Sequence, residues 1–281
     1  SSDDTTSVAW GDVDGDGDLD LAVGHSGQPD VVYLNTGTTL EDTPGWSSSE
    51  SDTTLGLAWG DVDGDGDLDV WVTQNRPAGQ GGRMPTPYWD ANDGHPAYLL
   101  MNDGKGNFRE ETIPAGLAAK RGRRVTASAL VDLDGDLDND LVMASEYAGL
   151  DIFYNNGKGV FSDATPSLAA NRHAFGQGLA LADFNGDGMT DVFLAGRSST
   201  AARRLQAMGL GRDAFEEHNR HRTGMSAGNK LLLNVGRFLN PTTPPAPLAP
   251  TVSRSRSVTA RTATSSAAVR SAPLPTHASV A

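Results

Sequence analysis

The stretch Asp12-Val13-Asp14-Gly15-Asp16-Gly17-Asp18-Leu19-Asp20 has an aspartate at every second position of a nine-residue segment. Three further stretches align with it without gaps, at residues 61–69, 132–140 and 183–191, and successive starts lie 49, 71 and 51 residues apart. Self-similarity at such spacings is typical of repeat architectures, in which each repeat is one supersecondary unit. The chain therefore contains four copies of one unit, each marked by an Asp-rich loop.

A second landmark follows each loop. An Asn-x-Gly triplet begins 23, 41, 23 and 51 residues after the first aspartate, at Asn35, Asn102, Asn155 and Asn234. Asn and Gly tolerate positive φ, so the triplet predicts a hairpin turn. The second and fourth units therefore carry inserts of 18 and 28 residues between the loop and the triplet.

Apolar runs place the strands around these landmarks. One run precedes each loop, a second leaves it and a third ends at the Asn-x-Gly triplet; a fourth follows at residues 107–110 and 160–163. Four antiparallel strands in about 50 residues describe one blade of a β-propeller. We therefore expect an all-β fold of about four blades over residues 1–236. Because turns alternate between the two ends of antiparallel strands, the inserts are expected on the face opposite the Asp loops.

These units resemble the FG-GAP or VCBS repeats of β-propellers, which occur in the heads of integrin α subunits and in many bacterial secreted proteins. The resemblance spans roughly residues 7–236, and Phe175-Gly176 matches the name-giving Phe-Gly, whereas the Gly-Ala-Pro half is absent. Residues 208–211 and 228–231 also look like bacterial members with an ASPIC/UnbV-type region. Such relatives close with about seven blades, so four repeats imply an incomplete or open propeller.

The loops have the donors and the spacing of calcium sites. Ca²⁺ takes six to eight oxygen ligands, and aspartates at loop positions 1, 3 and 5 put three carboxylates inside a tight turn. Position 7 is predicted to offer its backbone carbonyl and position 9 a last carboxylate, while Gly at position 6 permits the bend. The candidate ligands are Asp12, Asp14, Asp16, Asp18 and Asp20; Asp61, Asp63, Asp65, Asp67 and Asp69; Asp132, Asp134, Asp136, Asp138 and Asp140; and Asp183, Asn185, Asp187, Met189 and Asp191.

The third loop departs from this pattern at position 6, where Leu137 replaces Gly. If the position needs positive φ, the strain costs on the order of 1 kcal/mol. We therefore expect the third loop to be the weakest metal site. An EF-hand is excluded for all four loops, because position 12 is Val23, Val72, Met143 or Leu194 rather than Glu.

The charge is concentrated in these loops, which hold 18 of the 36 acidic residues of a chain with net charge −14. Concentrated carboxylates repel one another unless a cation neutralises them. No basic stripe favours a nucleic-acid partner, and no apolar run approaches the length of a membrane span. The chain has no Cys, so it has no disulfide framework. The polar, acidic residues 1–4 indicate that no signal peptide is present in this chain.

Two inserts offer further candidates. Tyr88-Trp89-Asp90, with His95 nearby, could stack on a sugar or a partner, or could be the packing of a long loop. His218 and His221 are spaced for a metal or acid–base site on a helix, or for a solvated helix of mixed charge.

The sequence favours a calcium-stabilised extracellular binding or adhesion module, with a protein or carbohydrate ligand contacting the loops opposite the calcium face. No nucleophile, Walker or dinucleotide signature is present, so we expect that the chain is not an enzyme. The alternative is the scaffold portion of a larger secreted enzyme, with its active site in the inserts or outside this chain.

A composition shift marks residues 237–281, which hold 7 of the 15 Pro and no Asp, Glu, Lys or Gly. One interpretation is a disordered Pro/Ser/Thr/Ala-rich tail. The other is a slip of reading frame near Gly236, because residues 258–265 can spell another Asp/Gly loop in a shifted frame. Sequencing the gene distinguishes the two.

Overall fold

The computed structural model describes residues 4–234 apart from residues 50, 52, 75, 77–78, 80–83, 201–203, 205–206 and 211–215. The side chains of residues 169–171, 217 and 218 are also left out, so the histidine pair at 218 and 221 is described only at His221. The tail predicted for residues 237–281 lies outside the described residues. In the described part, no helix is long and apolar enough to cross a membrane.

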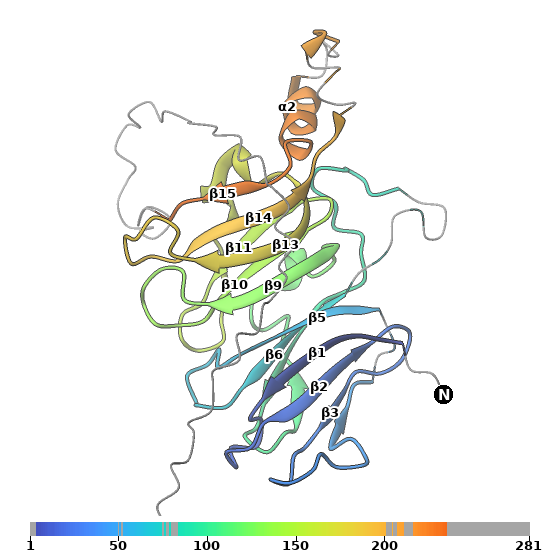
Figure 1. The fold of residues 1–281 in the computed structure, drawn as a ribbon, viewed down its shortest axis with the longest axis vertical. Helices are drawn as coiled ribbons and strands as arrows, with labels where there is room; N and C mark the ends of the chain where they lie inside the picture. The colour runs from blue at the N-terminus through green and yellow to red at the C-terminus, as the bar shows by residue number, and fades with distance from the viewer. Residues whose placement is uncertain are drawn as a thin grey trace, which may run out of the picture. The chain divides into compact units, whose positions relative to one another are not determined.

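Four antiparallel sheets follow one another in chain order (Figure 1). Each is paired in the order in which its strands occur in the chain, which is the meander of a propeller blade. The strands are β1 (Thr5–Gly11), β2 (Asp20–His25), β3 (Val31–Tyr33) and β4 (Trp46–Ser47); β5 (Thr54–Gly60), β6 (Asp69–Gln74), β7 (Tyr98–Asn102) and β8 (Phe108–Glu110); β9 (Val125–Val131), β10 (Asp140–Ser145), β11 (Gly149–Tyr154) and β12 (Ser162–Asp163); and β13 (Phe175–Ala182), β14 (Asp191–Arg197) and β15 (Lys230–Leu232).

The predicted all-β architecture of blades is confirmed, including the open arrangement: among the described residues no strand pairs the first sheet with the fourth. Three sheets have the four expected strands. In the fourth sheet, β13, β14 and β15 are described, and the residues after its triplet lie outside the described part.

The Asp loops connect the first and second strands of each blade, as predicted. The residues at the base of each loop pair directly across the two strands, for example Gly11 with Asp20 and Gly60 with Asp69. Val131 with Asp140 and Ala182 with Asp191 repeat this register. Each loop is therefore a hairpin connection whose two ends are fixed by the sheet.

Neighbouring blades pack through apolar faces. Leu57 and Trp59 of the second blade pack against Val13, Ala22 and Val32 of the first. Residues of the second and third blades share the next cluster, and residues of the third and fourth blades share the one after it. The core is thus a series of similar junctions, each made by two successive repeats.

The two inserts connect the second and third strands of their blades, between β6 and β7 and between β14 and β15. The second of them contains α2 (Glu216–Met225), and short 3₁₀ segments at Ala118–Lys120 and Thr165–Arg172 precede the third and fourth blades. Since the Asp loops connect strands one and two, the antiparallel order puts the inserts at the opposite end of the strands. We call these two ends the loop end and the insert end.

Candidate metal centres

The carboxylate of the first aspartate in each loop accepts hydrogen bonds from two backbone amides of the same loop. In the first loop, Gly15 N donates to Asp12 Oδ1 at 2.9 Å and Gly17 N donates to Asp12 Oδ2 at 3.1 Å. The same two bonds form at Asp61, Asp132 and Asp183. The carboxylates at positions 3 and 5 accept the amides two residues ahead, which continues the turn.

Positions 4 and 6 of the loops require a left-handed backbone. The glycines of the first loop have φ of 74° and 94°. Leu137, at position 6 of the third loop, has φ of 74° and is the only described non-Gly residue with positive φ. The predicted backbone demand at this position is therefore confirmed, and the leucine side chain is exposed to solvent. The third loop carries a strain of about 1 kcal/mol that the other loops avoid.

The last aspartate of each loop, at position 9, is buried and holds two segments together. Its Oδ2 accepts the amide of position 2 at 2.8–3.0 Å, and its Oδ1 accepts the amide of the triplet asparagine at 2.7–2.9 Å. These residues are Asp20, Asp69, Asp140 and Asp191. The sequence predicted them only as metal ligands; the structure adds that each one ties its loop to the Asn-x-Gly turn.

Three loops bring three carboxylates together. Atoms of Asp12, Asp14 and Asp20 lie within 4.8 Å of one another, and so do atoms of Asp61, Asp63 and Asp69. In the third loop the group consists of Asp132, Asp134 and Asp136. Such a set of hard oxygen donors fits Ca²⁺, and each buried oxygen that accepts one amide keeps a second lone pair for a cation.

The fourth loop is different, because Asn185 replaces the second aspartate and donates through Nδ2 to Asp187 Oδ2 at 2.8 Å. Among the described residues, no group of three acidic side chains forms there. Its candidate ligands Asp183, Asn185, Asp187, Met189 and Asp191 remain predictions, as do the backbone carbonyls at position 7 of every loop.

Burial and mutual repulsion disfavour the charged carboxylates. Burial raises the pKa of Asp69 to about 6 and that of Asp140 to about 7, with smaller contributions from the neighbouring loop aspartates. Burial and Asp136 raise the pKa of Asp134 to about 6. Among the described residues, no ion pair joins a loop aspartate to Lys or Arg. The part of the chain that the structure describes therefore supplies no neutralising charge to the loops.

The Asn-x-Gly triplet is a partner of the loop as well as a turn. Its glycine has positive φ, at 84° for Gly37, 71° for Gly104 and 68° for Gly157. A Cβ at any of these three positions would also come within 2.8 Å of a carboxylate oxygen of the aspartate at loop position 7, so that carboxylate would have to move. The positive φ is the stronger reason for glycine here, because the carboxylate is the end of a flexible side chain.

The triplet asparagine links each loop to the next blade. Asn102 Nδ2 donates to the carbonyl of Val13 at 2.7 Å, across the boundary between the first and second blades. Asn155 makes the same bond to Val62 at 2.7 Å, and Asn234 makes it to Leu133 at 2.6 Å. Each acceptor is position 2 of the preceding Asp loop. We call this contact the asparagine clasp; spacing along the sequence gave no signal of it, because its partners lie 89–101 residues apart.

At the insert end, the two inserts meet. The ring of Trp89, from the second blade, stacks on His221 of α2 with centroids 5.3 Å apart and planes 5° apart. His221 is buried and also contacts His173 edge to face at 4.3 Å. The prediction that this helix is solvated is therefore wrong at His221, whose side chain is buried. Burial, with Arg172 nearby, lowers the pKa of His173 to about 4, and its Nδ1 donates to the Trp89 carbonyl at 2.9 Å.

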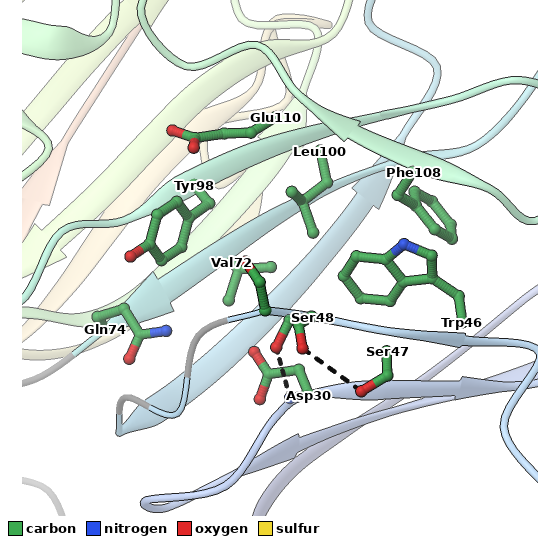
Figure 2. A pocket seen from close by; sticks show the side chains of 11 residues that line it. Asp30, Trp46, Ser47, Ser48, Val72, Gln74, Tyr98, Leu100, Phe108 and Glu110 are labelled. Carbon is green, nitrogen blue, oxygen red and sulfur yellow. Dashed lines mark hydrogen bonds between the residues drawn. The ribbon is translucent and has the colours of Figure 1, made fainter.

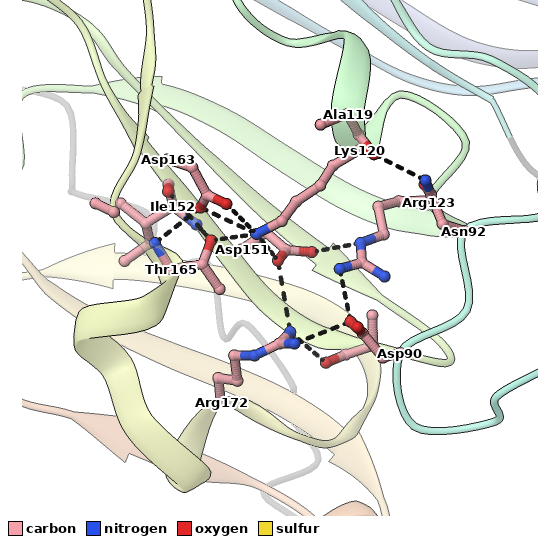
Figure 3. A network of polar contacts seen from close by, with 12 residues as sticks. Asp90, Asn92, Ala119, Lys120, Arg123, Asp151, Ile152, Asp163, Thr165 and Arg172 are labelled. Atoms are coloured by element: carbon pink, nitrogen blue, oxygen red, sulfur yellow. Dashed lines mark hydrogen bonds and ion pairs between the residues drawn. The ribbon is translucent and has the colours of Figure 1, made fainter.

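An ion network lies beside these rings (Figure 3). Asp151 is fully buried and lies 2.8 Å from Lys120 Nζ, 2.9 Å from Arg123 Nε and 3.5 Å from Arg172 Nη1. Asp90, in the insert of the second blade, pairs with Arg123 and Arg172 at 2.7 and 2.9 Å. Although burial raises the pKa of Asp90, the two guanidiniums hold it below its ordinary value.

The network links three parts of the chain. Asp90 comes from the insert of the second blade and Asp151 from β11, while Arg172 comes from the segment that enters the fourth blade. Tyr88-Trp89-Asp90 therefore packs within its own loop, where the rings of Tyr88 and Trp89 meet edge to face at 5.0 Å, and it also packs against distant repeats.

A cavity of about 290 Å³ lies between the first two blades (Figure 2). Trp46, Tyr98 and Phe108 contribute aromatic walls. On the polar side, Asp30 accepts hydrogen bonds from His25 N and Thr54 Oγ1, and Gln74 donates to Thr54 Oγ1 at 2.9 Å. Sequence reasoning missed this cavity, because its lining comes from two repeats and has no local pattern.

Comparison with known proteins agrees with this architecture. A family model described as an FG-GAP-like repeat matches residues 12–72 and 132–194. Each match begins at the first aspartate of a loop and ends in the second strand of the next blade. The chain therefore carries FG-GAP-like repeats, and the predicted resemblance to them is confirmed. The VCBS and ASPIC/UnbV resemblances stay predictions.

Two solved structures that match part of the chain have low TM-scores and low sequence identity. One is BBS1N in complex with ARL6DN, soaked with lead, at 14% identity and TM-score 0.38, over 70% of this chain and 53% of that chain. The other is the rhamnogalacturonan lyase PL11 of Bacillus licheniformis, at 18% identity and TM-score 0.41, over 68% of this chain and 39% of that chain. The chain thus spans about half or less of the length of these proteins. The comparison with curated proteins finds no match.

Proposed function

We propose that this chain is a calcium-stabilised, non-catalytic binding or adhesion module of the extracellular type. The observation that carries the proposal is the clustering of carboxylates in the Asp loops without a counter-charge from the described residues. Three of the loops gather three carboxylates within 4.8 Å, and the described residues supply no ion pair to balance that charge. A bound divalent cation would remove the repulsion and join the two strands and the turn that meet at each loop.

The asparagine clasp extends this stabilisation to the junctions between blades. The carbonyl that accepts the clasp belongs to position 2 of a loop, next to two candidate ligands. Ordering the loop by a cation therefore orders the acceptor that holds the following blade. Calcium is expected to stabilise the stack of blades as well as the individual loops.

The insert end is the proposed surface for a protein or carbohydrate ligand. Segments from the second and fourth blades come together there through Trp89 and His221, next to exposed edges of the ion network. Loops on a rigid propeller face are the usual place for recognition. The pairing of Asp90, Asp151, Arg123 and Arg172 with one another supports a binding rather than a catalytic role.

Thermal unfolding with and without calcium tests the metal proposal. Starting from protein whose calcium content has been verified, excess EDTA should lower the melting temperature, because each well-occupied site contributes about 3 kcal/mol at a hundredfold excess of calcium over Kd. Re-addition of calcium should restore it. An unchanged melting temperature in EDTA would contradict calcium stabilisation.

The ligand proposal needs a separate measurement. Calcium-loaded protein is screened against glycan and protein arrays, with Trp89→Ala as the variant at the insert end and Val160→Ala as an exposed control in the turn after Asn155, at the loop end. A ligand whose binding is lost in Trp89→Ala and kept in Val160→Ala supports recognition at the insert end. Equal binding by both variants would place recognition elsewhere.

A further inference from the structure

The three internal junctions define what one blade offers to the next. At each junction, the earlier blade contributes two buried side chains, one from position 2 of its loop and one from the middle of its third strand. These pairs are Val13 and Val32 in the first blade, Val62 and Leu99 in the second, and Leu133 and Ile152 in the third. All six are at most 4% exposed. The later blade offers the two apolar positions of its first strand, which are Leu57 and Trp59 in the second blade.

The same positions are uncovered at the two ends of the series. In the fourth blade, Phe184 and Leu231 occupy the positions of Val13 and Val32, and they are 48% and 50% exposed; Leu233 beside them is 42% exposed. We call Phe184, Leu231 and Leu233 the tail face.

In the first blade, Val8 and Trp10 occupy the positions of Leu57 and Trp59, and they are 57% and 54% exposed. Leu19, which corresponds to Leu68 at the first junction, is 56% exposed. We call Val8, Trp10 and Leu19 the head face. The two faces are therefore the two unmatched halves of the junction that the chain forms three times internally.

The asparagine clasp of the junction also has one partner on each face: the donor belongs to the first blade and the acceptor to the fourth. The side-chain amides of Asn155 and Asn234 each donate once within their own blade and once to the preceding loop. Asn35 makes only the first of these bonds, to Leu19 O at 3.0 Å. Its second amide hydrogen has no partner among the described residues. In the other blades the acceptor is the carbonyl at position 2 of the preceding loop, and in the fourth loop that position is Phe184.

We propose that the head face of one copy of this chain docks on the tail face of a second copy and reproduces the internal junction. In it, Trp10 would pack on Phe184 and Leu231, and Asn35 Nδ2 would donate to Phe184 O. A second copy carries both complementary halves, which is why we choose it as the occupant. Two such contacts between two copies make eight blades, within the range in which propellers close. The contact is heterologous, since different surfaces of the two copies meet.

Sedimentation velocity on the full, calcium-loaded chain from about 1 to about 100 μM tests the proposal. The unmodified chain should shift from monomer to dimer as its concentration rises. Trp10→Asp and Phe184→Asp should each abolish the dimer, while Ile113→Asp, at an exposed apolar residue on neither face, should leave it unchanged. Thermal unfolding of each variant confirms that it is folded.

Mixing the two variants gives the decisive result. Phe184→Asp keeps an intact head face and Trp10→Asp keeps an intact tail face, so the mixture should contain a species of twice the monomer mass that neither variant forms alone. A monomeric unmodified chain over the whole range would overturn the proposal. A dimer lost in one variant and kept in the other would also overturn it, because it would indicate a symmetric contact of one face with itself.

Discussion

The loop end and the insert end of this molecule both contain clustered aspartates, but the charges around them differ. At the insert end, Asp90, Asp151 and Asp163 are matched by Lys120, Arg123 and Arg172. At the loop end, the aspartates are held by backbone amides, and no described Lys or Arg pairs with them. The comparison teaches that the described residues balance the carboxylates at the insert end and leave those at the loop end without a counter-charge. We therefore expect added calcium to affect the loop end and not the insert end.

The largest expected effect is at the insert end. Replacing Asp151 by Ala leaves Lys120, Arg123 and Arg172 with too few counter-charges in a buried site, and removing one partner of such a group costs about 3–5 kcal/mol. The loss should be the same in calcium and in EDTA. Chemical denaturation in both buffers measures it.

Asp163→Ala is the matched control for that variant. Among the described residues Asp163 forms an ion pair only with Lys120, accepts the amide of Thr165 at 3.0 Å and is partly exposed, so its loss should cost only about 1–2 kcal/mol. Equal losses in Asp151→Ala and Asp163→Ala would contradict a central role for Asp151.

The next effect is a pH dependence at the insert end. The pKa of His173 is lowered from 6.5 to about 4 in the folded chain, so between these values the unfolded chain binds more protons. Stability from this group is therefore full above pH 6.5 and is lost as pH falls toward 4, by up to about 3 kcal/mol. Denaturation of the unmodified chain and of His173→Gln between pH 4 and 7 gives the contribution as a difference. Parallel curves would contradict it.

At the loop end, the expected effect depends on calcium. Asp65→Ala removes a candidate ligand at position 5, which is exposed, and leaves the buried Asp69 with its two backbone bonds intact. The variant should bind one ion fewer by titration calorimetry and lose about 3 kcal/mol in excess calcium. In EDTA its stability should be close to that of the unmodified chain, since the loss of the exposed bond from Asp67 N to Asp65 Oδ1 is offset by the removal of one repelling charge. A loss that is equal in both buffers would show that Asp65 acts through the fold rather than through a metal.

The smallest effect concerns the third loop. Leu137→Gly removes the strain of a positive φ at an exposed side chain, which should stabilise the folded chain by about 1 kcal/mol. The net gain is smaller, because glycine has more conformational entropy to lose on folding than leucine. Calcium affinity of the third site should rise with it. Gly66→Leu in the second loop is the reciprocal variant and should weaken its site; no change in either variant would mean that position 6 does not limit binding.

Much of the fold could be predicted from short-range pattern. In the first and third units the Asn-x-Gly turn begins 23 residues after the first aspartate of the loop, and the same landmarks recur around the inserts of the other two units. This periodicity specifies a hairpin-linked blade. The demand for positive φ at Leu137 was also predictable, because four aligned copies identify the residue that departs from them. The repeats likewise indicated that the inserts lie opposite the loops.

Other features depended on the tertiary structure. The asparagine clasp, the stacking of Trp89 on His221 and the ion network around Asp151 join residues from different blades. The predicted solvated helix was wrong at His221 because the insert of another repeat covers it. No local spacing encodes such contacts.

The sequence alone therefore determined the repeating unit and the donor set of its loops, because backbone geometry within a few residues decides where alternate side chains point. Only the tertiary structure decided which carboxylates have counter-charges and which apolar faces are covered. Both depend on how one blade stacks on the next, and the groups that meet there are separated by tens of residues along the chain.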